Sequence, residues 1–242
     1  MSIANTEQAE HWNTGPSVAH WVANQARYDR MHAPFTTLIL QAAALRSGGT
    51  SVAAFKPVVT GTDEPEPGRQ MDHELLAVVA GAVPNQVAPL RFGPPVSPHL
   101  AAELAGAAIE PAELVTAARD AAARADALIA EGVGGLLVPL TLGYSVRDFA
   151  VDLGLPLLVA ARPGLGTINH TLLTLEAAAA AGLDVRAVVL TPWAAAPGAM
   201  ERSNRATIAA LGRVEVATLP RVGVTPPELA AAGAALAPER WL

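Results

Sequence analysis

The chain has 242 residues, 51% of them hydrophobic and 4% aromatic, and it contains no cysteine. This length suits one α/β domain with a full core of Ala, Val and Leu, and the lack of cysteine excludes disulfides, thiolate metal ligands and a cysteine nucleophile. The formal net charge of -6 argues against a nucleic-acid partner. Because no apolar run is long enough for a membrane helix and the first residues lack a signal-peptide pattern, we expect a cytoplasmic protein without membrane contact.

Residues 1–37 form an atypical N-terminal segment, and we place the domain boundary before residue 38. Four of the chain's ten aromatic residues fall here: Trp12, Trp21, Tyr28 and Phe35. Residues 17–30 predict an amphipathic helix. The segment resembles the opening helix of class I S-adenosylmethionine-dependent methyltransferases, but the glycine-rich cofactor turn of that family does not follow it.

From residue 38 onward, strands and helices alternate. Helices are predicted at 38–46, 72–80, 110–127, 145–153, 167–181 and 199–211. Strands are predicted at 51–55, 127–130, 155–160, 186–190 and 214–219. Runs such as LPLLVA and RAVVL are continuously apolar, which is typical of parallel strands covered on both faces. We therefore predict an α/β fold, a doubly wound, mainly parallel sheet with helices on both faces.

The stretch EGVGGLLVPL at 131–140 directly follows the predicted strand 127–130. In open α/β sheets, ligands bind at the carboxyl ends of the strands. A glutamate there, beside glycines that let a ligand approach the main chain, can reach a metal ion or a phosphate. For Glu131-Gly132 alone, a tight turn with a solvated glutamate is an equal alternative, but the ten residues together are more specific than that.

Other motifs are predicted at the same edge of the sheet. Lys56, the only lysine in the chain, follows a strand and leads to Thr60, so chemistry that needs an ammonium group has one candidate. Residues 161–170 lead into a helix N-terminus, where free amides favour anions. Asp72 opens a helix, where the alternative role is an N-cap, and for Ser97-Pro98-His99 the alternative is a turn and cap.

Six motifs occur together in one order: FKPVVTG at 55–61, DHELLA at 72–77, SPHLAAELAG at 97–106, EGVGGLLVPL at 131–140, LPLLVAARPGLGTINHTLLTLEA at 155–177 and ERSNRATIAALG at 201–212. Through them, the chain from about residue 38 to 220 resembles dethiobiotin synthetase, particularly its actinobacterial members. The resemblance implies a P-loop NTPase-like fold and a role in biotin biosynthesis. The implied reaction is ATP-dependent carboxylation and ring closure of 7,8-diaminononanoate, with carbon dioxide and ATP as the other small-molecule substrates.

The resemblance also implies roles for individual residues. Lys56 would neutralise the carbamate and the transferred phosphoryl group, and Thr60 would form a hydrogen bond nearby. Ser97, Pro98 and His99 would line the diamine site.

Oxygen ligands for Mg²⁺ would come from Asp72 and Glu131 by the same resemblance. Glu131 and the amides of Gly132, Val133 and Gly134 would contact substrate or nucleotide phosphate. Thr191, where many family members have an asparagine that reads adenine, and Pro220 would lie near the nucleotide base. The family is dimeric, so we expect a homodimer.

One part of the family pattern is absent. The sequence contains no G-x-x-x-x-G-K-[ST] motif, and residues 34–37 occupy the place where the family's phosphate-binding loop ends. Such a loop cradles the β- and γ-phosphates, and its loss predicts phosphoryl transfer slower by orders of magnitude. It also predicts a missing central strand, with marginal stability or a gap filled by another segment.

Three alternatives follow from this pattern. The first is an enzyme of the dethiobiotin synthetase type. The second is a non-catalytic hybrid or degenerate member that retains the fold and the substrate pocket. The third is a methyltransferase, which the absent cofactor turn disfavours. Nucleotide binding separates the first two.

Overall fold

The structure is a computed structural model that describes residues 45, 47–64, 70–223 and 225–241. The predicted boundary at 37/38, the predicted helix 17–30 and most of the predicted helix 38–46 lie outside the described residues. Leu45 is helical, as predicted; Ser47, one residue beyond the predicted end, is helical too, and Gly49 follows with a φ of +91°. No helix in the described ranges is long and apolar enough to cross a membrane.

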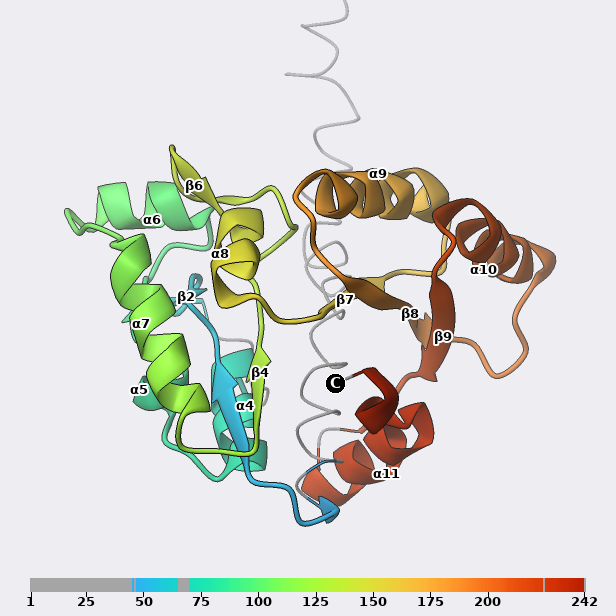
Figure 1. Ribbon diagram of the computed structural model, residues 1–242, viewed down its shortest axis with the longest axis horizontal. Coiled ribbons are helices and arrows are strands. Elements are labelled where there is room, and N and C mark those ends of the chain that lie inside the picture. Colours follow the sequence, from blue (N-terminus) through green and yellow to red (C-terminus); the bar gives the residue numbers. More distant parts are fainter. Residues whose placement is uncertain (1–44, 46, 65–69, 224, 242) are drawn as a thin grey trace, which may run out of the picture. The chain divides into compact units, whose positions relative to one another are not determined.

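Strands and helices alternate through the described chain (Figure 1). The strands are β1 (Val52–Phe55), β2 (Val58–Val59), β3 (Leu90–Arg91), β4 (Ala127–Ala130), β5 (Pro139–Thr141), β6 (Tyr144–Ser145), β7 (Leu157–Ala161), β8 (Val185–Trp193) and β9 (Glu215–Pro220). The helices are α4 (Asp72–Ala80), α5 (Pro84–Val87), α6 (Pro98–Leu104), α7 (Pro111–Ala122), α8 (Val146–Leu153), α9 (Thr167–Ala180), α10 (Ala199–Gly212), α11 (Pro226–Leu236) and the 3₁₀ helix η2 (Pro238–Trp241).

Most strand pairs are parallel, which confirms the predicted fold class. β1 pairs with β4, β2 with β3, and β8 lies between β7 and β9, all in parallel, whereas β5 and β6 form an antiparallel hairpin. Among the described strands these pairings form four separate ladders rather than one continuous sheet. No described strand pairs with the second edge of β4 or of β7.

In the two main ladders, side chains on opposite faces of a strand enter different cores. We call the largest cluster the shared core; its buried members are Leu45, Val52, Ala54, Leu75, Leu76, Ala77, Val79, Ala80, Val87, Ile129, Ala187, Val189, Ala217, Leu219, Leu229, Leu236 and Trp241. Phe55, on the other face of β1, packs in a second cluster with residues of α7 and α8. Val188 and Leu190 pack in a third cluster with residues of α9 and α10.

Helices therefore cover both faces of the two main ladders. α4 contributes to the shared core on one face of β1, and α7 packs on the other face. For the ladder of β7, β8 and β9, α9 and α10 lie on one side and α11 on the other (Figure 1). The shared core contains residues of both ladders, and it joins them in one hydrophobic cluster.

Element bounds differ from the predictions in a few places. The predicted helix 110–127 ends at Ala122, because the N–H groups of Asp126 and Ala127 donate to the Ser51 carbonyl and so draw the chain into β4. The step at Ser97-Pro98-His99 is the start of α6, with Ser97 at the N-cap and Pro98 in the first turn. α5, α11, η2 and the short strands β2, β3, β5 and β6 were not predicted.

Candidate active site

Lys56 and Glu131 lie next to each other because β1 and β4 end in register. Phe55 is paired with Ala130, so the next residue of each strand leaves the same edge of the ladder. The Glu131 N–H donates to the Phe55 carbonyl at 2.8 Å, which continues the ladder by one step. Both side chains therefore start at the carboxyl ends of neighbouring parallel strands, where α/β sheets bind ligands.

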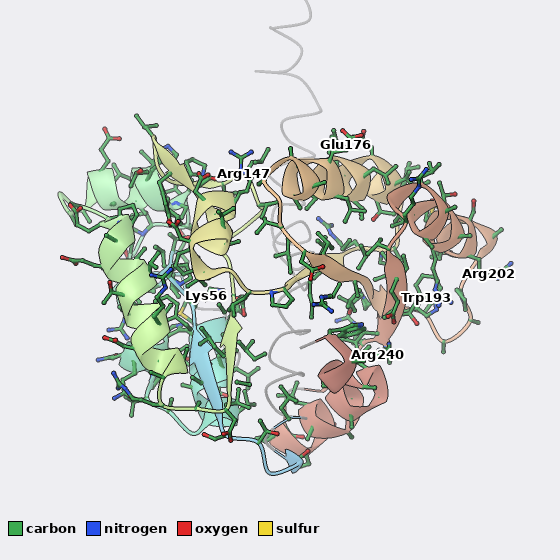
Figure 2. The ribbon with its side chains drawn as sticks, viewed as in Figure 1. Lys56, Arg147, Glu176, Trp193, Arg202 and Arg240 are labelled. Carbon is green, nitrogen blue, oxygen red and sulfur yellow. The ribbon has the colours of Figure 1, made fainter. Side chains whose placement is uncertain are left out.

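The ammonium group of Lys56, a residue labelled in Figure 2, forms ion pairs with two carboxylates. It forms a hydrogen-bonded ion pair with Glu131 Oε1, and its Nζ is 3.4 Å from Oδ2 of Asp72, the first residue of α4. Lys56 and Glu131 are 4% and 2% exposed, whereas the Asp72 side chain is 28% exposed. The cluster thus has a buried pair and one carboxylate that solvent can reach.

Burial and charge act in opposite directions on this pair. Burial disfavours the ammonium group, but the charges of Glu131 and Asp72 raise the pKa of Lys56 above its ordinary value of 10.5. Burial raises the pKa of Glu131 from 4.5 to about 7, and Asp72 adds to this, although Lys56 opposes it. The lysine therefore stays charged at neutral pH, whereas the glutamate titrates near it.

The oxygen atoms of the cluster suit a hard cation. Glu131 Oε2 is buried without a hydrogen-bond partner in the described chain, and Asp72 adds an accessible carboxylate. In the described ranges, no group of three or more His, Cys, Asp and Glu side chains could hold a metal ion. Mg²⁺ needs no such group, because it binds through one or two carboxylates together with water and substrate phosphates. The two carboxylates therefore fit Mg²⁺ better than a metal enclosed by protein ligands.

We call residues 132–138, which follow Glu131, the glycine loop. The loop needs its glycines for space and for backbone conformation. A Cβ atom on Gly132 would lie 2.8 Å from Val146 Cγ1 of α8. Gly134 has a φ of +68°, and a Cβ there would lie 2.9 Å from a methyl group of Val138. The loop therefore holds its main chain close to α8 at Gly132, and neither Gly132 nor Gly134 adds a side chain beside the main-chain amides.

The predicted diamine residues lie on the neighbouring segment of the chain. Thr60 directly follows β2, and the residues after it bond to the segment after β3: Gly61 N–H donates to Pro94 O and Thr62 N–H to Phe92 O. Ser97 lies three residues beyond Pro94. His99 is in the first turn of α6, and its Nδ1 is buried without a partner among the described residues. Their roles stay predictions.

The two residues predicted near the nucleotide base lie on the other main ladder. Thr191 is buried within β8 and precedes Pro192 through a cis peptide bond. Pro220 ends β9 and pairs in register with Trp193. The structure thus places Lys56, Asp72 and Glu131 in one cluster and Thr191 and Pro220 at the ends of separate strands, where their nucleotide role also stays a prediction.

Comparisons with known proteins connect this geometry to a family. Residues 35–229 match a family described as an AAA domain (AAA_26). A protein of Mycobacterium sp. (strain KMS) named ATP-dependent dethiobiotin synthetase BioD is 40% identical over 205 residues, which are 83% of this chain and 89% of that protein. The chain belongs to the dethiobiotin synthetase family.

Further members of the dethiobiotin synthetase family give the same result. The protein of the same name from Mycobacterium avium (strain 104) is 42% identical over 178 residues, which are 72% of this chain and 76% of that protein. The one from Anaeromyxobacter dehalogenans (strain 2CP-1) is 44% identical over 149 residues, which are 61% of this chain and 66% of that protein. The resemblance drawn from the six motifs is thereby confirmed.

The sequence-based prediction did not include two buried residues of this dethiobiotin synthetase family member. His73, beside Asp72, is buried; burial lowers its pKa, and its Nδ1 has no hydrogen-bond partner in the described chain. Asn204 donates from Nδ2 to Pro163 O at 2.9 Å and Gly164 O at 3.1 Å, and so fixes the loop before α9. An asparagine inside a predicted helix was the available signal, because asparagine is a weak helix former.

Proposed function

We propose that this chain forms dethiobiotin from 7,8-diaminononanoate, carbon dioxide and ATP, and so acts in biotin biosynthesis. The single observation that carries the proposal is the buried cluster of Lys56 and Glu131 beside Asp72, at the carboxyl ends of two parallel strands. Membership of a family whose relatives are named ATP-dependent dethiobiotin synthetase supports the substrate assignment.

The reaction transfers one phosphoryl group and closes one ring. One amine of the substrate attacks carbon dioxide and loses a proton, which gives a carbamate. A carbamate oxygen then attacks the γ-phosphorus of ATP, and ADP leaves. The second amine attacks the carbonyl carbon of the mixed anhydride, so that a C–N bond forms, a C–O bond breaks and inorganic phosphate leaves with a proton released. Lys56 acts as the positive charge that binds the carbamate and the phosphoryl oxygens, since phosphoryl transfer depends on positioning and charge.

The two carboxylates of the cluster would hold Mg²⁺. Asp72 offers an accessible oxygen and Glu131 a buried oxygen without another partner. When bound, Mg²⁺ supplies positive charge to the phosphate oxygens of ATP. Lys56 holds the Glu131 carboxylate in place, and Thr60, Ser97 and His99 would orient the diamine from the neighbouring segment.

One sequence feature favours a second candidate function. The chain has no G-x-x-x-x-G-K-[ST] motif, and its sole lysine is in the Lys56 cluster. The chain therefore has no second lysine side chain to bind the β- and γ-phosphates. The second candidate is therefore a non-catalytic family member that binds the diamine without transferring phosphate.

Calorimetric titration with Mg²⁺ and ATP, with diamine and bicarbonate present, followed by phosphate and product analysis, separates the two candidates. We expect saturable binding, phosphate release and dethiobiotin, with Lys56→Met slowing turnover by about 100-fold or more. Arg186→Met is the control for loss of a cation, because Arg186 of β8 is exposed, pairs with Asp184 and is remote in sequence from the cluster. A folded protein that binds diamine but releases no phosphate would establish the non-catalytic candidate. Sedimentation of the same sample tests the proposed homodimer.

A further inference from the structure

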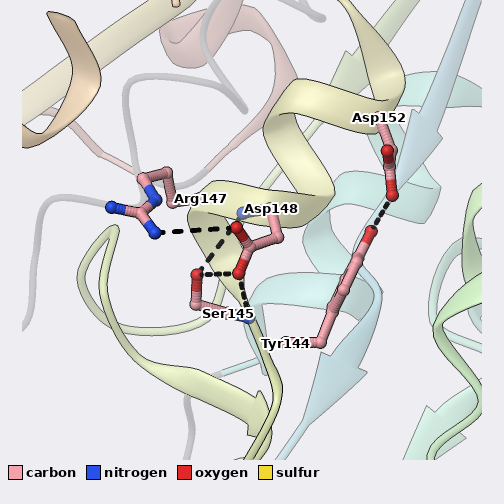
Figure 3. Close-up of polar contacts among 5 residues, drawn as sticks. All are labelled: Tyr144, Ser145, Arg147, Asp148 and Asp152. Atoms are coloured by element: carbon pink, nitrogen blue, oxygen red, sulfur yellow. Dashed lines mark hydrogen bonds and ion pairs between the residues drawn. The ribbon is translucent and has the colours of Figure 1, made fainter. Parts of the chain in front are cut away.

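Helix α8 begins with a reciprocal pair of hydrogen bonds between Ser145 and Asp148 (Figure 3). Asp148 Oδ2 accepts from the Ser145 N–H at 2.8 Å and from its Oγ at 2.6 Å, and the Asp148 N–H donates back to Ser145 Oγ at 3.4 Å. These bonds lower the pKa of Asp148, so it stays a charged acceptor at neutral pH. The first turn of α8 is thereby fixed.

The remaining amides of this first turn bind the glycine loop. A helix start leaves its first N–H groups without partners inside the helix. In α8, the Val146 N–H donates to Val138 O at 3.0 Å, and the Arg147 N–H donates to Leu136 O at 2.7 Å. Two carbonyls of the segment that follows Glu131 are therefore held by the helix start.

Side chains of α8 also contact both halves of the candidate active site. Val146 lies against Gly132, the residue after Glu131, with no space for a Cβ atom between them. The Phe149 ring stacks on Phe55, the residue before Lys56, with ring centroids 6.1 Å apart. α8 thus touches the neighbour of each member of the Lys56–Glu131 pair.

The last turn of α8 is fastened as well. Tyr144 Oη, just before the helix, donates to Asp152 Oδ2 at 2.6 Å (Figure 3), and Arg119 of α7 donates to the Asp152 carbonyl at 2.6 Å. Because both ends of α8 are held, a change at its first turn is passed to the glycine loop rather than absorbed by movement of the whole helix.

We infer that Asp148, with Ser145, is a positioning residue of the candidate active site: it fixes the start of α8, whose amides and Val146 hold the glycine loop and set the place of Glu131 beside Lys56. The inference deepens the proposed function and, for its consequence in catalysis, rests on it. Asp148 touches neither substrate nor metal in this assignment. It acts through the helix start.

The chain offers a matched control. At the start of α11, Glu228 Oε2 accepts from the N–H and Oγ1 of Thr225, the same two donors at the same three-residue spacing. Glu228→Ala therefore removes an equivalent cap from a helix that does not follow the glycine loop. Both substitutions remove the same kind of capping bonds, so both are expected to destabilise the start of their own helix.

Because Lys56 is the only lysine, labelling with ¹³C-lysine gives one set of side-chain signals that reports on the site without any turnover. We expect Asp148→Ala to shift the Lys56 Cε–Hε signal at fixed pH, Asp148→Asn to shift it less, and Glu228→Ala to leave it in place. If Asp148→Ala does not fold, Ser145→Ala is measured instead, because it removes only the Ser145 hydroxyl and keeps the Asp148 carboxylate. An unchanged Lys56 signal in a folded Asp148 or Ser145 variant, or an equal shift in Glu228→Ala, would overturn the inference.

Binding separates this inference from the proposed function. We expect Asp148→Ala to weaken Mg²⁺ binding, measured with ATP present, by about tenfold or more, as for other residues that orient metal ligands. The value of kcat at saturating Mg²⁺ should change by a smaller factor than the Mg²⁺ dissociation constant. If the unsubstituted chain releases no phosphate, the proposed function fails, while the Lys56 signal still decides the role of Asp148.

Discussion

At the residue scale, a lysine that is 4% exposed needs compensation for its buried charge. Removing one partner of such a pair leaves the other charge without compensation. We expect Lys56→Met to lower the free energy of unfolding by roughly 3–5 kcal/mol in urea denaturation.

The double variant Lys56→Met/Glu131→Leu provides the control. It removes both charges and keeps apolar volume, so it should recover most of the stability that Lys56→Met loses. Equal losses in the single and double variants would show that the two charges do not compensate each other.

The raised pKa of Glu131 predicts how stability changes with pH. Burial raises this pKa from 4.5 to about 7, so the folded chain binds the proton more tightly than the unfolded chain does. The stabilisation of the folded chain by protonated Glu131 is complete below pH 4.5 and is lost as pH rises through about 7. This stabilisation is on the order of 3 kcal/mol. In metal-free buffer, unfolding free energies should fall across this window, and the fall should be smaller in Glu131→Gln. Identical pH profiles for the two proteins would contradict the assignment.

At the element scale, the strand ends could be predicted from the sequence and the connections between them only in part. The apolar run before Glu131 and the Lys-Pro step after Phe55 mark both strand ends, and parallel pairing then brings Lys56 and Glu131 to one edge. The cap at Ser97 was among the alternatives, but the helix that follows it was not predicted, because a short helix that opens on proline has the same local pattern as a turn. The S-x-x-D spacing of Ser145 and Asp148 was a usable capping signal, but the contact of that helix start with the glycine loop depends on tertiary structure.

The close approach of α8 and the glycine loop makes Gly132 sensitive to a single methyl group. A Cβ atom at this position would lie 2.8 Å from Val146 Cγ1. We expect Gly132→Ala to destabilise the fold by about 1–3 kcal/mol, because the added atom forces the two segments apart. Thermal or urea unfolding of Gly132→Ala, Val146→Ala and the double variant checks this. The double variant should be more stable than the sum of the single effects, and additive losses would rule out the clash.

At the scale of the whole described domain, the shared core joins the two main ladders in one hydrophobic cluster. Trp241 of η2 is 4% exposed within this core, and its Nε1 donates to Glu215 Oε2 at 3.2 Å. We expect Trp241→Ala to cost about 3–5 kcal/mol, and hydrogen exchange should then increase in both main ladders together, since both contribute to that core.

Arg240→Ala is the neighbouring control. The Arg240 guanidinium bonds to the same glutamate, Glu215, at 2.6 Å but is about half exposed. Its loss should cost at most about 1 kcal/mol, as for other exposed ion pairs. A similar loss from Arg240→Ala and Trp241→Ala would mean that the contact with Glu215, rather than burial of the indole, stabilises η2.

The α/β class could be predicted at this scale because continuously apolar strands alternate with amphipathic helices. The division into separate ladders follows from strand pairing, which depends on long-range contacts that local patterns do not encode. The absence of the family's phosphate-binding loop was evident from the sequence. The calorimetric titration with Mg²⁺ and ATP measures whether another segment binds the phosphates.

The make-up of the shared core has a consequence for synthesis on the ribosome. Val52 of β1 and Trp241 of η2 belong to the same cluster, although 189 positions separate them along the chain (241 minus 52). At about 5–20 residues per second, roughly 10–40 seconds pass between the translation of these two residues. During that time the apolar face of β1 lacks part of its final covering. The nascent chain would therefore depend on partial packing or on chaperones until Trp241 has emerged from the exit tunnel.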